Sequence, residues 1–146
     1  RVLGIRIADC VPLYLFDPHT RTGALVHAGR AGTFSRIATQ ATQALRENYN
    51  CDPANIHALI GPSAGPCCYE VSEAIAQEFA ESGGVTHGRY LDLWKTNQAQ
   101  LLQQGLHPKN IHISQTCTIC TDQFHSYRKN APTARNIALL HIHQET

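Results

Sequence analysis

Apolar positions along the first third of the chain predict three β-strands separated by turns. Residues 1–8, 11–16 and 24–27 are rich in β-branched, aromatic and other apolar side chains, which favour strands. Asp, Pro, Thr and Gly crowd residues 17–23, and these residue types favour a turn. The chain therefore begins as a run of strands with one dense turn inside it.

Three later segments carry apolar or small residues at steps of three and four, which is the spacing of one helical face. These segments are residues 35–48, 72–79 and 92–104. The first is preceded by a tight turn that Gly29 and Gly32 bracket. We expect three helices that pack on the strands.

Short apolar runs at residues 56–60, 111–114 and 137–143 complete the predicted strands. The combined pattern predicts an α+β fold, in which helices pack on a mixed β-sheet. We expect one domain over residues 1–146, because this length suits a single core. The chain contains no Met and begins inside a predicted strand, so we expect this domain to be N-terminally incomplete.

Charge and composition narrow the class of partner. The net charge is +1 and the basic residues are scattered, so no nucleic-acid surface is indicated. Apolar runs such as residues 137–140 are far shorter than the roughly 20 residues of a membrane helix. A chain of this size needs no disulfides, so its six cysteines suggest reduced thiols in a cytoplasmic protein. Small-molecule partners fit these properties best, and the oligomeric state stays open.

Cys10 and His27 form the first candidate for chemistry, because each lies at the end of a predicted strand. A thiolate and an imidazole can share a zinc ion that keeps an open position for water. The same pair can instead form a Cys–His nucleophilic dyad. Spacing alone also allows a buried Cys and a structural His, so these alternatives remain open.

A second candidate combines Cys117 and Cys120, in a CxxC spacing, with the adjacent pair Cys67 and Cys68 and with His125. CxxC is a zinc-ligand spacing. Two adjacent cysteines predict poor chelating geometry, so free thiols are the simpler interpretation here.

The third candidate is the stretch of residues 124–135, which holds Ser126, Arg128, Lys129 and Arg135. Arginine binds phosphate or carboxylate with a rigid pair of donors. The alternative is a solvated basic loop. The Gly- and Pro-rich residues 61–66 lack the ending of a P-loop, so nucleoside triphosphate binding is not indicated.

Several motifs occur in the order of a known family. They are Ala8-Asp9-Cys10-Val11-Pro12, Val26-His27-Ala28-Gly29, the run from Ile60 to Val71, Asp92-Leu93 with Asn97, Cys117-Thr118 and Ser126-Tyr127-Arg128. With these motifs the chain resembles the YfiH/YlmD family. That is the laccase-domain group, whose members also carry the name polyphenol oxidase and are now regarded as zinc-dependent purine nucleoside enzymes.

The resemblance implies a YfiH-like α+β fold and a zinc ion held by Cys10, His27 and a second His that would precede Arg1. It implies a purine nucleoside phosphorylase acting on adenosine, inosine and methylthioadenosine, with adenosine deaminase activity. Asp9 would orient a ligand or transfer a proton. Ser126, Arg128 and Arg135 would bind the nucleoside and phosphate.

Two departures from the family pattern bear on phosphate binding. Many members have Trp-Arg after the His-Ala-Gly, where this chain has Arg30-Ala31, so that arginine contact is shifted to Arg30 or lost. Lys129 replaces the second Arg of the common Ser-Tyr-Arg-Arg, which keeps the charge and loses the paired donors.

Three alternatives to the phosphorylase remain open from the sequence. The first is a Cys–His amide hydrolase, since the family fold is likened to a toxin deamidase. The second is a copper-dependent polyphenol oxidase, and the third is a binding fragment without activity.

Overall fold

The computed structural model describes residues 1–143, and the last three residues of the predicted domain lie outside the described part. The strands are β1 (Val2–Ile7), β2 (Val11–Asp17), β3 (Thr22–Ala28), β4 (His57–Ile60), β5 (Val85–His87), β6 (Tyr90–Asp92), β7 (Ile111–Ile113) and β8 (Asn136–His141). The α-helices are α1 (Arg30–Phe34), α2 (Ile37–Tyr49), α3 (Glu73–Glu81) and α4 (Leu93–Gln103), with short 3₁₀ helices at Pro53–Asn55 and Pro108–Asn110.

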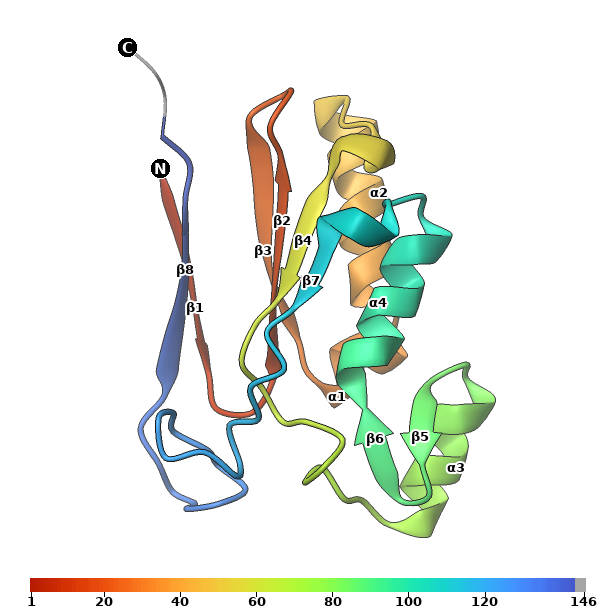
Figure 1. The fold of residues 1–146 in the computed structure, drawn as a ribbon, viewed down its shortest axis with the longest axis vertical. Coiled ribbons are helices and arrows are strands. Elements are labelled where there is room, and N and C mark those ends of the chain that lie inside the picture. The colour runs from red at the N-terminus through yellow and green to blue at the C-terminus, as the bar shows by residue number, and fades with distance from the viewer. Residues whose placement is uncertain (144–146) are drawn as a thin grey trace.

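A four-stranded mixed sheet in the order β3-β2-β4-β7 forms the centre of the molecule. Strand β2 runs antiparallel to both β3 and β4, and β4 runs parallel to β7. Helices α2 and α4 lie on one side of this sheet, and the antiparallel pair β1–β8 lies on the other (Figure 1). The predicted mixed α+β architecture is confirmed.

The central strand β2 is covered on both faces, and its burial pattern shows this. Val11, Leu13 and Leu15 are fully buried, and the intervening positions are buried or half-buried as well. A strand with only one covered face alternates between buried and exposed positions instead. Strand β2 therefore lies in the centre of the core, and Cys10, which precedes its first residue, has a defined position.

Helix α2 packs through a narrow face of small residues. Ala38, Thr42 and Leu45 recur at helical spacing and are buried, and the Thr42 hydroxyl donates to the carbonyl of Ala38 within the helix. Small side chains on this face let the helix approach the sheet closely. The predicted helix over residues 35–48 thus exists with slightly shifted ends.

Two local features differ from the sequence expectation. Gly32 lies inside α1 rather than in a turn, and the chain breaks between α1 and α2 at Arg36, whose φ of 60° ends the helical geometry. The β5–β6 hairpin was not predicted, because its strands are only three residues long and carry no clear alternation. Among the described residues, no helix has the length and apolarity of a membrane span.

Candidate functional site

Cys10 and His27 lie at the same end of the β2–β3 ladder. The antiparallel register pairs Val11 with Ala28 and Pro12 with His27, so Cys10, one residue before β2, faces the end of β3. Both side chains line one cavity of about 330 Å³. The sheet register therefore brings together two residues that are far apart in the sequence.

Gly29 makes room for the Cys10 sulfur. A Cβ atom at residue 29 would lie 2.7 Å from the Cys10 Sγ atom, which is closer than such atoms approach in proteins. The backbone at Gly29 has a φ of −74°, which any residue adopts, so the requirement is for space rather than for backbone freedom. The glycine of the Val-His-Ala-Gly motif is thus explained by the thiol packed against it.

The donor atoms of Cys10 and His27 suit a zinc ion. Within residues 1–143, no hydrogen bond engages the Cys10 Sγ atom or the His27 ring. Burial raises the pKa of the Cys10 thiol, the Asp9 carboxylate raises it further, and Arg135 lowers it. A thiol in this setting ionises readily only beside a cation such as a bound metal. Zinc takes this combination of sulfur and imidazole ligands.

Asp9 is held by two hydrogen bonds from distant parts of the chain. The Thr118 hydroxyl donates to Oδ1 at 2.7 Å, and the backbone N–H of Arg128 donates to Oδ2 at 2.8 Å. The carboxylate is almost fully buried, and the Asp9 backbone has a φ of 96°. Both oxygens are already engaged, so this geometry favours a positioning role over proton transfer.

Arg128 and Arg135 share the cavity with Cys10 and His27, and Arg6 lines it as well. Arg128 lies over the Tyr69 ring, 4.5 Å from its centroid, and also donates to the carbonyl of Glu70. Arg135 lies 5.5 Å from the centroid of the Tyr127 ring. The three arginines and the two tyrosines all line the cavity, which gives it positive charge and two aromatic faces.

Ser126 and Lys129 do not line this cavity, although they belong to the same predicted stretch. Ser126 is buried, and its Oγ atom accepts from the backbone N–H of Lys129. The Lys129 ammonium donates to Asp122 Oδ1 at 2.6 Å and to the Thr121 carbonyl. The geometry thus gives Ser126 a role in the turn, and the change from Arg to Lys at position 129 removes no donor from the cavity.

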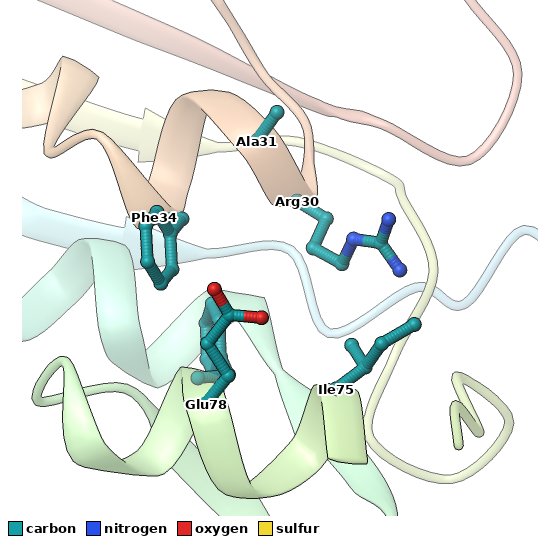
Figure 2. Close-up of a pocket in the computed structure, with 6 residues that line it drawn as sticks. Arg30, Ala31, Phe34, Ile75 and Glu78 are labelled. Carbon is teal, nitrogen blue, oxygen red and sulfur yellow. The ribbon is translucent and has the colours of Figure 1, made fainter.

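Arg30 lies outside this cavity, in hollows that adjoin α1 and α3. It lines a hollow of about 190 Å³ between α1 and α3, where its side chain extends away from Phe34 and Glu78 (Figure 2). Arg30 also lines an adjoining hollow of about 430 Å³ together with Arg89 and Arg128. Its placement is compatible with the predicted shift of an arginine contact to residue 30.

Three charged or aromatic cavity residues were not singled out from the sequence: Arg6, Tyr69 and Tyr127. Tyr69 and Tyr127 lie inside the family motifs, and an aromatic residue beside a polar loop was the signal that could have identified them. Arg6 carried no such signal, because it lies within β1, and it lines the cavity as part of the continuous run of residues 6–10.

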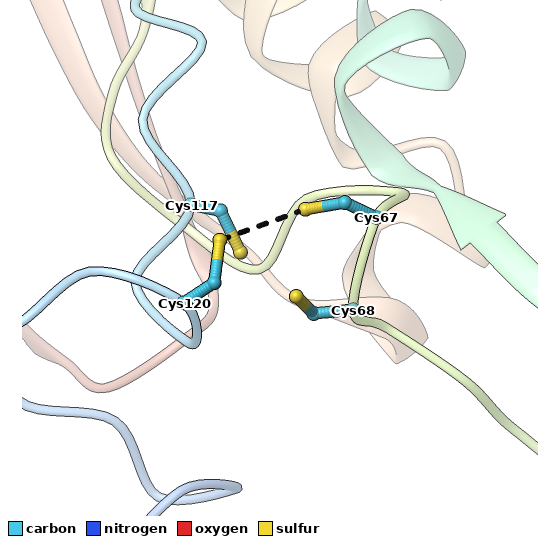
Figure 3. A group of neighbouring side chains, drawn as sticks. All are labelled: Cys67, Cys68, Cys117 and Cys120. Atoms are coloured by element: carbon cyan, nitrogen blue, oxygen red, sulfur yellow. Dashed lines mark hydrogen bonds between the residues drawn. The ribbon is translucent and has the colours of Figure 1, made fainter.

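The described residues contain one group of three or more potential metal ligands, and it is formed by Cys67, Cys68, Cys117 and Cys120. Their sulfur atoms all lie within 4.8 Å of one another, so these thiols are placed to hold a metal ion (Figure 3). The expectation of poor chelating geometry for Cys67 and Cys68 was wrong. His125 does not belong to this group.

The protein has an α+β fold, and a thiol, an imidazole and three guanidinium groups line one cavity at the end of the β2–β3 ladder. The sequence model of the family described as "multi-copper polyphenol oxidoreductase laccase" matches residues 1–143. The chain belongs to this family, which includes YfiH and YlmD.

Similar proteins carry the name purine nucleoside phosphorylase. The enzyme YlmD of Geobacillus stearothermophilus is 31% identical over 99% of this chain, and the match covers 57% of that relative. A relative from Aquifex aeolicus is 35% identical over 91% of this chain and 62% of its own length. The chain therefore spans somewhat more than half the length of these relatives.

Solved structures show the same fold. The crystal structure of YlmD from Geobacillus stearothermophilus matches with a TM-score of 0.86 at 32% identity, over 94% of this chain and 56% of the other. The Bacillus licheniformis YfiH structure matches with a TM-score of 0.85 at 29% identity and the same coverage. The predicted YfiH-like fold is confirmed.

Proposed function

We propose that this protein is a zinc-dependent purine nucleoside phosphorylase whose active site is the cavity of Cys10 and His27. One observation carries the proposal: two metal-type donors and three guanidinium groups, those of Arg6, Arg128 and Arg135, line the same cavity. Relatives at about 30–36% identity are named purine nucleoside phosphorylases, which supports the substrate class. The activity belongs to the complete protein.

In phosphorolysis, a phosphate oxygen bonds to C1′ of the ribose while the bond from C1′ to the purine nitrogen breaks. The bonding electrons leave with the purine, which takes up a proton, and ribose 1-phosphate remains. A zinc ion held by Cys10, His27 and one further ligand would supply Lewis acidity toward the phosphate or a water. Arg128 and Arg135 neutralise the phosphate and orient it toward C1′.

The aromatic faces suit a purine base. Tyr69 and Tyr127 both line the cavity, and a flat base stacks on such rings with a gain of about 1–3 kcal/mol. Burial raises the pKa of the Tyr69 hydroxyl, while Arg30 and Arg128 lower it. Tyr69 therefore serves as a neutral surface that also holds Arg128 in place.

Adenosine deamination belongs to the same proposal as a second reaction of the site. Water replaces phosphate as the nucleophile and attacks C6 of adenosine, which gives inosine and ammonia. Adenosine, inosine and methylthioadenosine are the nucleosides we propose as substrates.

The six free thiols agree with the expected cytoplasmic location, which remains a prediction.

Neither of the other predicted enzyme classes gains support from the geometry. His141 and His143 have neighbouring rings, but Val2 pairs with His141, so this pair lies at the end of β1 away from Cys10. The part of the chain that the structure describes gathers no histidine-rich group of three or more ligands, which a multi-copper centre needs. The Cys–His hydrolase requires an ionised thiol, whereas burial raises the pKa of Cys10.

The products of a single incubation test the proposal. Zinc-loaded complete protein is mixed with adenosine, with and without phosphate, and the products are separated by chromatography. We expect adenine and ribose 1-phosphate only when phosphate is present, with inosine as the product of the second reaction. Absence of adenine from fully zinc-loaded protein would contradict the proposal.

A further inference from the structure

The four-cysteine cluster joins two loops that lie far apart in the sequence. Cys67 and Cys68 come from the loop between β4 and α3, and Cys117 and Cys120 come from the loop after β7. The four sulfur atoms converge from the two sides (Figure 3). The Cys67 and Cys120 sulfurs are 3.9 Å apart, and all pairs lie within 4.8 Å.

These distances match a metal site better than a disulfide. Zinc–sulfur bonds of about 2.3 Å in a tetrahedron place the sulfur atoms about 3.8 Å apart. A disulfide requires a sulfur–sulfur distance of about 2.05 Å. The observed spacing of Cys67 and Cys120 is close to the tetrahedral value.

A turn makes the adjacent cysteines act together. The backbone N–H groups of Cys68 and Tyr69 both donate to the carbonyl of Gly65, at 3.1 and 3.0 Å. In a strand, neighbouring side chains would point to opposite faces. The turn instead lets the Cys67 and Cys68 sulfurs face the same point, as Figure 3 shows.

A backbone N–H group orients the Cys117 sulfur. Gly65 donates its N–H to this sulfur at 3.3 Å. Hydrogen bonds that orient and stabilise a ligand atom are typical of metal sites.

We propose that Cys67, Cys68, Cys117 and Cys120 bind one zinc ion in a four-thiolate structural site, separate from the site of Cys10 and His27. Binding releases the four thiol protons and forms four zinc–sulfur bonds. Four thiolates in a tetrahedron suit zinc, and they leave no open position for a substrate. The site is therefore structural rather than catalytic.

The ion would fix two walls of the active cavity. Thr118, next to Cys117, donates to the Asp9 carboxylate, and Tyr69, next to Cys68, lies under Arg128. Neither loop contains a helix or an extended strand at these positions. In the absence of regular secondary structure, the bound ion would hold the two loops, and with them these two contacts, in place.

Metal analysis of the complete Cys10→Ser protein tests this inference without disturbing the cluster. We expect about one zinc per chain to remain, with an X-ray absorption spectrum that shows four sulfur neighbours at about 2.3 Å. Zinc absent from this variant, iron or copper in its place, or nitrogen neighbours in the spectrum would overturn the inference.

Cobalt substitution provides the second measurement. Cobalt added to the reduced protein should give the intense visible bands of a four-thiolate tetrahedral site, both in wild type and in Cys10→Ser. The double variant Cys67→Ser/Cys120→Ser should lose these bands, whereas Cys51→Ala, which removes a cysteine outside the cluster, should keep them. Bands that survive in the double variant would overturn the inference. Loss of phosphorolysis in Cys10→Ser with these bands intact would separate this site from the proposed catalytic one.

Discussion

Replacing Asp9 tests whether this carboxylate positions the site or transfers a proton. In Asp9→Ala, the buried Thr118 hydroxyl and the partly buried Arg128 N–H lose their acceptor. Each hydrogen bond to a charged group contributes about 1.5–3 kcal/mol, so the loss totals about 3–6 kcal/mol. Alanine also tolerates the φ of 96° poorly. Such a loss is a large part of a typical stability of about 5–15 kcal/mol.

Asp9→Asn is the matched control. Asparagine adopts positive φ readily, its carbonyl can accept from the Arg128 N–H, and its amide can donate to the Thr118 oxygen. We expect this variant to lose only about 1–2 kcal/mol, because two charged hydrogen bonds become neutral ones. Urea unfolding followed by the fluorescence of Trp94, the one tryptophan of the chain, measures both variants.

The same pair of variants reports on the chemistry. If Asp9 positions the loops, Asp9→Asn keeps most of the phosphorolysis, since its contacts persist. Burial is the main cause of the raised pKa of Cys10 and the Asp9 charge adds to it, so removing the charge lowers this pKa. We therefore expect the rate of Cys10 alkylation in metal-free protein to rise at a lower pH in Asp9→Asn than in wild type. Peptide mass spectrometry measures this rate. Equal destabilisation by Asn and Ala, or an unshifted alkylation profile, would refute this reasoning.

Three further substitutions test the packing around the site. Gly29→Ala should lower the free energy of unfolding in urea by about 1–3 kcal/mol, because its Cβ meets the Cys10 sulfur. The loss should disappear in a Cys10→Ala background. A loss that persists in that background would contradict the packing account. Asn97→Ala removes a buried hydrogen bond to Thr33 that ties α4 to α1 and a second one to the Leu93 carbonyl within α4. It should cost about 2–3 kcal/mol by the same measurement, and a loss below about 0.5 kcal/mol would count against this account. Tyr69→Leu should raise the KM for phosphate about two- to thirtyfold, because about 0.5–2 kcal/mol of contact between the ring and Arg128 is lost. Tyr69→Phe keeps the ring and should leave this KM unchanged. Equal effects of the two variants would argue against the ring contact.

The sequence predicted the helices and the main strands because each of them carries a clear periodicity. The burial of Ala38 and Leu45 follows the apolar spacing that predicted α2, and Thr42 is buried between them. The β5–β6 hairpin and the break at Arg36 could not be predicted, since three-residue strands and a single left-handed residue leave no periodic signal.

The same contrast holds for the cavity. Strand ends in the sequence suggested that Cys10 and His27 meet, and the register of β2 with β3 places them in one cavity. The contacts of Asp9 with Thr118 and Arg128 depend on how distant loops cross, which no local pattern encodes. The convergence of the four cysteines was missed for a related reason. It depends on a turn at Gly65 that the sequence shows only as a Gly- and Pro-rich loop.

Release of ribose 1-phosphate from adenosine by Cys10→Ser tests the central claim most directly. The measurement compares zinc-supplied complete wild-type protein, Cys10→Ser and the Cys51→Ala control at saturating phosphate. We predict that Cys10→Ser loses the activity while its urea unfolding stays close to that of wild type, and that Cys51→Ala retains activity. Unchanged release of ribose 1-phosphate by Cys10→Ser would remove this thiol from the reaction and contradict the proposed function of the cavity.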